Sequence, residues 1–204
     1  MKTRLLTLLL SIGLAFNLMP AQAQLTESSS NENAILNASP ELKKHYANVF
    51  MNAFKNLCIP YIAQPDQLQN QLQNATLLSP ELANQLLNNT PGKAWVLEKS
   101  KEHGFHFLVT VNNHYYCAIQ TMSADPVEVE KLFAEIISTA PENSEFSLLK
   151  DETIEQDNGN IAHRQSYTLT NKNSMAVIQF SLRTNSISQR SVPQATIFML
   201  INQI

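Results

Sequence analysis

The spacing of apolar and polar positions changes along the chain. A mostly apolar run at 5–18 is followed by a polar, aperiodic stretch at 24–39 that is rich in Ser and Asn. Between residues 42 and 57, apolar side chains recur every three or four positions, which predicts an amphipathic helix. From residue 93 onwards apolar positions tend to alternate with polar ones, which is the period of strands.

Helix start and stop signals divide the chain further. Ser-Pro or Asp-Pro pairs open three of the expected helices, because Ser and Asp cap free N–H groups and proline suits the first helical position. The pattern predicts helices at 40–57, 64–74, 80–90 and 125–140. Pro60 is expected to end the first of them.

Seven strands are predicted from the alternating segments. Asn112-Asn113 is read as a two-residue turn that would place Val111 opposite His114. The strands are expected at 94–99, 105–111, 114–121, 146–156, 161–170, 175–183 and 195–202. Helices first, then strands with one inserted helix, indicate an α+β fold in which N-terminal helices pack on a mostly antiparallel sheet of about 6–7 strands. We expect a single domain over 40–204.

The N-terminus has the pattern of a signal peptide. Lys2 and Arg4 precede the apolar run, Pro20 breaks it, and Ala21-Gln22-Ala23 offers a cleavage site, so cleavage is expected near Ala23. The alternative is an N-terminal membrane anchor, which the short run disfavours. Residues 1–23 are therefore assigned to the signal, 24–39 to a disordered leader, and the mature chain is expected in the periplasm or outside the cell, with no membrane span.

The two cysteines of the chain, Cys58 and Cys117, fit an exported protein. Oxidising compartments favour disulfides, and with two cysteines only one intramolecular pairing exists. A disulfide would join the end of the first helix to the second side of the 105–121 hairpin. Free buried thiols or one reactive thiol are the alternatives.

Charge and composition exclude several classes of function. The 204 residues carry a net charge of −3, and the chain without the signal carries 12 basic and 17 acidic residues, a net −5. Its basic residues look scattered, so nucleic acid is not an expected partner: Lys99, Lys101, Arg164, Lys172, Arg183 and Arg190. Four glycines leave no phosphate-binding loop, and no metal or cofactor is expected.

Candidate chemistry is sparse. The histidines His103, His106 and His114 and the acidic side chains at 98, 102, 151, 152 and 155 match no catalytic motif, so no catalytic residue is assigned. Aromatic residues gather around the 105–121 hairpin, where they either form core or make one wall of a ligand groove: Trp95, Phe105, Phe107, Tyr115 and Tyr116.

Residues 45–137 resemble a group of small exported proteobacterial proteins of unknown function. The resemblance is carried by Phe54-x3-Cys58, Gly92-x2-Trp95, Tyr116-Cys117 and Asp125-Pro-Val. It implies export, a bacterial envelope setting and a disulfide, and it supplies no catalytic residue. We therefore expect a non-enzymatic exported protein that binds a protein or another envelope component. The alternatives are an envelope hydrolase that uses carboxylates or His106 and His114, and a carrier of a small ligand.

Overall fold

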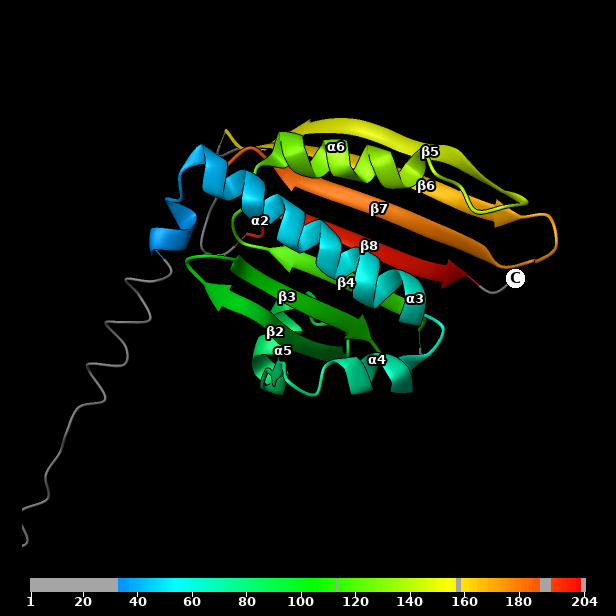
Figure 1. Ribbon diagram of the computed structural model, residues 1–204, viewed down its shortest axis with the longest axis horizontal. Helices are drawn as coiled ribbons and strands as arrows, with labels where there is room; N and C mark the ends of the chain where they lie inside the picture. Colours follow the sequence, from blue (N-terminus) through cyan, green and yellow to red (C-terminus); the bar gives the residue numbers. More distant parts are fainter. Residues whose placement is uncertain (1–32, 113, 157–158, 188–191, 203–204) are drawn as a thin grey trace, which may run out of the picture.

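The computed structural model describes residues 33–112, 114–156, 159–187 and 192–202 (Figure 1). The predicted signal at 1–23 and the leader up to residue 32 lie outside these residues. The end of the leader differs from the expectation: residues 33–36 form a helical turn, and Ile35 is buried in the core. The packed part of the chain therefore begins before Ser39, because the apolar side chain of Ile35 is buried against the core.

The first long helix continues beyond Pro60. Helix α2 (Pro40–Ala53) is capped by Ser39, whose hydroxyl accepts a hydrogen bond from the Leu42 N–H at 3.3 Å. A π-helical segment, η1 (Phe54–Cys58), follows and leads into the short helix α3 (Ile59–Tyr61). The wider π turn places Pro60 in the first turn of α3, where a proline needs no N–H partner.

The remaining helices are shorter than predicted. Helix α4 (Pro65–Gln71) and helix α5 (Pro80–Leu86) each begin at a proline and span seven residues. Helix α6 (Pro126–Ile137) is capped by Asp125, whose Oδ1 accepts from the Glu128 N–H at 3.0 Å. The start signals located the beginnings of α5 and α6 well, and their ends less well.

The expected α+β fold with six to seven strands is wrong. The described residues form one sheet of eight strands in the order β1-β2-β3-β4-β8-β7-β6-β5, and every neighbouring pair is antiparallel. The strands are β1 (Thr76–Leu77), β2 (Gly92–Ser100), β3 (Gly104–Val111), β4 (Tyr116–Thr121), β5 (Ser144–Glu155), β6 (Ile161–Asn171), β7 (Val177–Asn185) and β8 (Ala195–Asn202). The sheet dominates the structure, and the helices are few.

Two features explain this correction. Strand β1 has only two residues, too few to show an alternating pattern. The last strand, β8, returns to lie between β4 and β7, so it joins the early strands and the late strands into one sheet (Figure 1). Pairings between strands so distant in sequence leave no local signal.

The 105–121 hairpin has a longer connection than predicted. Thr110 pairs with Cys117, whereas the two-residue turn would have paired Leu108 with Cys117. Strand β3 ends at Val111 and β4 begins at Tyr116. This shift by two positions keeps every side chain on its predicted face, because side chains alternate with period two.

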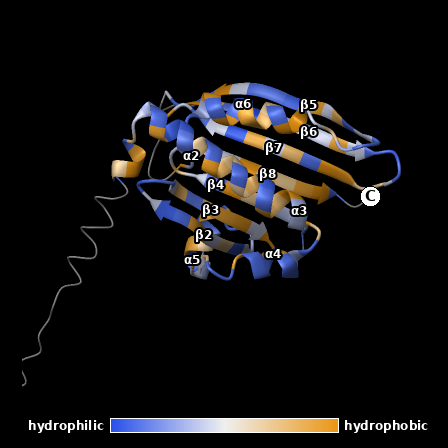
Figure 2. Ribbon diagram, in the orientation of Figure 1, coloured by the Kyte–Doolittle hydropathy of each residue, from blue (hydrophilic) through white to orange (hydrophobic). Residues whose placement is uncertain are grey.

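The two faces of the sheet are covered differently. We call the side with Leu108, Cys117 and Ile197 the helix face, and the side with Val109, Ala118 and Phe198 the far face. Helices α2 and α6 run over the helix face, and apolar residues are visible along both helices and the strands beneath them (Figure 2). On the far face, α5 packs over β2, β3 and β4. The described helices leave β8, β7 and β6 uncovered there.

Candidate functional site

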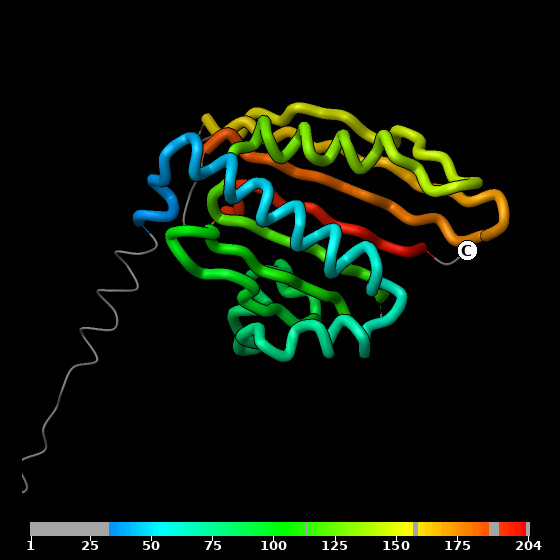
Figure 3. The backbone as a smooth tube through the Cα atoms, in the orientation of Figure 1, coloured from blue at the N-terminus to red at the C-terminus, as the bar shows by residue number. Residues whose placement is uncertain are grey.

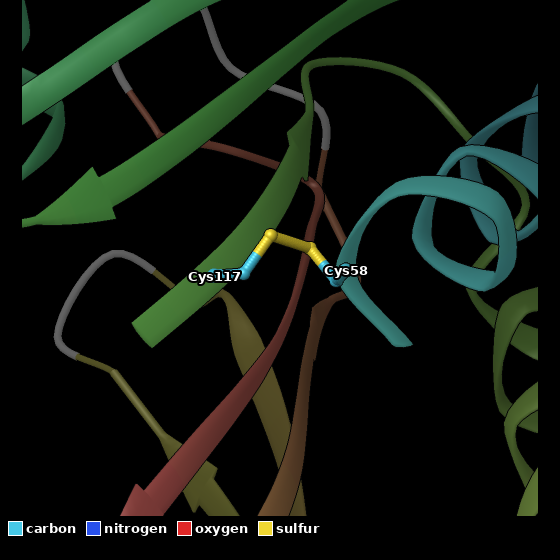
Figure 4. The surroundings of a disulfide bond; sticks show 2 residues. All are labelled: Cys58 and Cys117. Carbon is cyan, nitrogen blue, oxygen red and sulfur yellow. A yellow bond between two sulfur atoms is a disulfide. The ribbon is translucent and has the colours of Figure 1, made fainter. Parts of the chain in front are cut away.

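A disulfide joins the end of η1 to β4, as predicted. The Sγ atoms of Cys58 and Cys117 are 2.03 Å apart and both residues are fully buried (Figure 4). The bond closes a loop of 59 residues, which by chain entropy stabilises the fold by about 4 kcal/mol. It attaches the end of η1 to the helix face of the sheet, at the residue that follows Tyr116 in β4.

Three of the five aromatic residues predicted for a groove line one hollow. This first groove has a volume of about 560 Å³ and lies where α4 meets the ends of β2, β3 and β4. Trp95 is almost buried in its wall, whereas Tyr115 is exposed at its rim. Burial raises the pKa of Tyr116 to about 12, so its hydroxyl keeps its proton.

The other two predicted aromatic residues lie elsewhere. Phe105 and Phe107 pack against each other with ring centroids 4.6 Å apart, near the start of β3. The Lys99 ammonium lies 5.1 Å from the Phe105 ring centroid, within range of a cation–π interaction. Neither phenylalanine lines the first groove, so the five aromatic residues do not form one wall.

A second, larger groove crosses the far face. It has a volume of about 820 Å³, and its floor is made by β4, β8, β7 and β6. The α5 segment with the residues after it forms one wall, and Leu149 and Lys150 of β5 form the other. We call it the far-face groove. Val111 and Tyr116 line both grooves, so the two meet at the end of the β3–β4 hairpin.

Strand register arranges the floor of the far-face groove in rows, because residues paired across antiparallel strands share a face. One row runs across five strands as Gln120, Thr196, Arg183, Arg164 and Glu152. The next row runs as Ala118, Phe198, Ser181, Ser166 and Lys150. The second row has small residues in its middle, and these leave room above the floor.

The groove is apolar at one end and cationic at the other. Phe198 and Tyr116 lie together beneath the α5 side, with ring centroids 5.5 Å apart. The opposite end carries Lys150, Arg164 and Arg183. Glu152 is the acidic neighbour there, with its Oε1 2.8 Å from Lys150 Nζ and 3.5 Å from Arg164 Nη1.

Uncharged polar groups also line the far-face groove. The Ser166 and Ser181 hydroxyls are 2.5 Å apart and hydrogen-bonded, which satisfies one bond for each of two buried side chains. Gln120 donates its Nε2 hydrogen to the Leu86 carbonyl at 3.2 Å, but its buried Oε1 has no partner. An unpartnered buried acceptor is costly, so this oxygen is suited to a donor brought by a ligand.

The histidines proposed for catalysis do not converge. His106 is buried near the start of β3, and His114 is exposed beyond the other end of that strand. His106 Nε2 donates to the His103 carbonyl at 2.6 Å. Burial, partly offset by this hydrogen bond, lowers the pKa of His106 to about 4.

A different histidine does meet carboxylates. His163 on β6 places Nε2 2.7 Å from Asp151 and Nδ1 3.0 Å from Glu130 of α6, both carboxylate oxygens. A carboxylate on each ring nitrogen favours the doubly protonated form of the imidazole, which connects α6 to the sheet. None of these three residues lines either groove. The described residues contain no cluster of three or more His, Cys, Asp or Glu side chains suited to a metal ion.

Sequence reasoning missed the cationic end of the far-face groove. Arg164 and Arg183 look scattered in the sequence, yet the β6–β7 register places them directly opposite each other. Only the pairing of β6 with β7 shows that these two arginines are neighbours. Among the described helices, none has the length and apolar character needed to cross a membrane.

Comparisons of the chain with protein-family models, with curated proteins and with solved structures found no match.

Proposed function

We propose that this chain is an exported, non-catalytic binding protein that holds a component of the cell envelope in the far-face groove. The observation that carries the proposal is the groove itself, about 820 Å³ in volume. This volume is typical of ligand sites, as is the mixture of an apolar end with a few polar side chains.

The geometry favours this proposal over a hydrolase. Acid–base catalysis needs titratable groups within reach of one substrate atom. His106 and His114 are at opposite ends of β3, and His163 is engaged by two carboxylates. A carrier with an enclosed apolar cavity beside Trp95 is also less favoured, because the hollow there is a groove with polar and charged lining such as Lys93 and His114.

Export to the periplasm or beyond the cell is part of the same proposal. The pattern of residues 1–23, with cleavage near Ala23, supports it, and so does the resemblance of residues 45–137 to small exported proteobacterial proteins. The Cys58–Cys117 disulfide is compatible with an oxidising compartment.

The test is native mass spectrometry of the protein purified from the envelope fraction of bacteria that express the full chain. We expect a chain that begins at Gln24, with its cysteines oxidised, and a non-covalent adduct. Thr196→Phe would fill the floor of the groove and should remove the adduct. Thr139→Phe, at an exposed position after α6 that lines neither groove, is the matched control and should keep it.

The absence of any adduct on the wild-type protein would contradict the binding function. An adduct that survives Thr196→Phe would place the ligand elsewhere on the molecule. An uncleaved chain or free cysteines in the envelope fraction would contradict export independently of ligand binding.

A further inference from the structure

Two like charges face each other on the floor of the far-face groove. Arg164 of β6 and Arg183 of β7 are directly paired across antiparallel strands, so their side chains leave the same face of the sheet next to each other. Like charges in this position destabilise a sheet. The chain has only four arginines, so this pairing uses half of them at one point.

The neighbouring acidic group does not balance these charges. Glu152 pairs with Lys150 at 2.8 Å and reaches Arg164 at 3.5 Å. Arg183 makes no ion pair with any of the described residues. One carboxylate thus serves Lys150 and Arg164, and Arg183 adds an unbalanced positive charge to the groove of a protein whose net charge is −3.

We propose that Arg164 and Arg183 form an anion site, which takes the carboxylate or phosphate group of a small amphiphilic ligand. This inference rests on the proposed binding function and names the chemistry of its ligand. Guanidinium groups are well suited to both anions, because their planar N–H donors match the oxygens of a carboxylate or phosphate in pairs. Lys150, across from Ser166 in the adjacent row, adds a third cation within the same groove.

The apolar part of the ligand would lie on Phe198 and Tyr116. Thr196 pairs with Arg183, and Phe198 lies two positions further along β8 on the same face of the sheet. The Phe198 side chain is therefore a diagonal neighbour of the Arg183 side chain. Diagonal neighbours of this kind are about 7–8 Å apart, a distance that one small molecule can span. An anionic head and a short apolar body are therefore accommodated together.

Gln120, on the α5 side of the groove, adds a polar requirement. Gln120 Oε1 is buried and has no partner, and Gln120 stands in the same row as Arg183, separated by Thr196. A hydroxyl or amide N–H on the part of the ligand that lies over β4, beyond the anionic head, would supply the missing donor. We therefore expect ligands with such a donor to bind more tightly than a plain fatty acid.

The test is isothermal titration calorimetry with the disulfide-bonded mature chain. The probes are dodecanoate and dodecyl phosphate, with dodecyl maltoside as a neutral molecule of the same chain length and inorganic phosphate as a head group alone. All are used below the concentration at which they form micelles. We expect at least one anionic dodecyl probe to bind and the maltoside to bind at least about tenfold more weakly, as the loss of a charge-assisted contact implies.

Arginine variants sharpen the test. Arg183→Gln should weaken the anionic probe by about tenfold or more, and Arg183→Lys should restore part of this loss. Lys172→Gln removes one positive charge from an exposed position that does not line the groove, so it should leave binding unchanged. Dodecanoate and dodecyl phosphate compared side by side show whether the head is a carboxylate or a phosphate, and inorganic phosphate shows whether a free ion suffices.

A measurement of stability separates an anion site from a structural role. Without ligand, Arg183→Gln should unfold at the same temperature as wild type or higher, because it removes a like-charge pair. A lower unfolding temperature would indicate that Arg183 stabilises the fold and would overturn the inference. Equal affinity for anionic and neutral probes, no binding of either anionic probe, or binding unchanged by Arg183→Gln would also overturn it. The envelope adduct on the wild-type protein tests the binding function separately.

Discussion

His163 lies between two carboxylates that come from different elements. Burial alone would lower its pKa, but the hydrogen bonds to Asp151 and Glu130 outweigh that effect, so the pKa of His163 is raised. The hydrogen bond from His163 is also the main reason why the pKa of Asp151 is lowered. Protonated His163 and ionised Asp151 therefore stabilise each other in the folded protein.

These shifts define a window of pH in which the contact stabilises the fold. The contribution of His163 is full below its unfolded pKa of about 6.5 and is lost as pH rises through the raised folded value. The contribution of Asp151 is present above its ordinary pKa and is lost as pH falls through the lowered one. The contact should thus be strongest between about pH 4 and 6.5.

We predict that His163→Gln lowers the free energy of unfolding by about 1 kcal/mol or less at pH 5.5, because the groups are partly exposed. At pH 8.5 the difference from wild type should shrink. Urea unfolding of both proteins at the two pH values measures this. Equal differences at both values would show that the charge of His163 does not stabilise the fold.

His106 should destabilise the folded protein as the pH falls, which is the opposite of the effect of His163. Its folded pKa is lowered to about 4, mainly by burial, so the unfolded chain takes up a proton more readily between about pH 6.5 and 4. We predict that this group alone lowers the stability of the wild-type protein by about 2 kcal/mol between pH 7 and pH 5.

His106→Leu provides the measurement. Since the substitution leaves the other titrating groups in place, the wild-type and variant unfolding free energies are compared at each pH, and their difference isolates His106. The free energy of unfolding of the variant, relative to that of the wild type, should increase as the pH falls. If the difference between the two proteins does not change with pH, the buried neutral state assigned to His106 is wrong.

At the scale of elements, the disulfide determines how the end of η1 sits on the sheet. We predict that the double variant Cys58→Ser/Cys117→Ser loses about 4 kcal/mol of stability, because the unfolded chain is no longer closed into a loop of 59 residues. Urea unfolding of the oxidised wild type and of the variant measures the loss. A similar loss on reduction of the wild-type protein is the control for the serine side chains.

The sequence predicted the elements better than their assembly. Ser39, Ser79 and Asp125 marked three helix starts because capping is a local property of the chain. Alternation placed the long strands and sorted the side chains of β3 and β4 onto their correct faces. The continuation past Pro60 was missed because a π turn, which has no simple sequence signature, shifts the proline to a harmless position.

The candidate site was less predictable than the fold. Cys58 and Cys117 could be paired because no other cysteine exists. Trp95, Tyr115 and Tyr116 were predicted as groove residues because aromatic residues gather around the 105–121 hairpin. They do line one groove, but Phe105 and Phe107 do not. The Arg164–Arg183 pair depends on the register of β6 on β7, and the far-face groove depends on β8 entering between β4 and β7. Such long-range pairings are set by the whole fold.

At the scale of the whole molecule, strand β8 unites the sheet. It pairs with β4 on one side and with β7 on the other, so the strands on both sides of it share one hydrogen-bonded sheet (Figure 3). Its side chains on the helix face belong to the core. Ile197 is fully buried there and pairs with both Ile119 and Leu182. A substitution of Ile197 should therefore destabilise the strands on both sides of β8 together.

We predict that Ile197→Ala costs about 2–5 kcal/mol, the usual range for a buried isoleucine cut to alanine, while the protein still unfolds in one step. Fluorescence of Trp95, the only tryptophan, follows β2 on one side of β8, and circular dichroism follows the whole sheet. Ile161→Ala, at an exposed position on β6, is the control and should cost little. Because β8 is the link between the two sets of strands, both probes should shift to the same lower urea midpoint. A fluorescence midpoint that stays at the wild-type value while the dichroism midpoint falls would show that the two sets of strands fold independently.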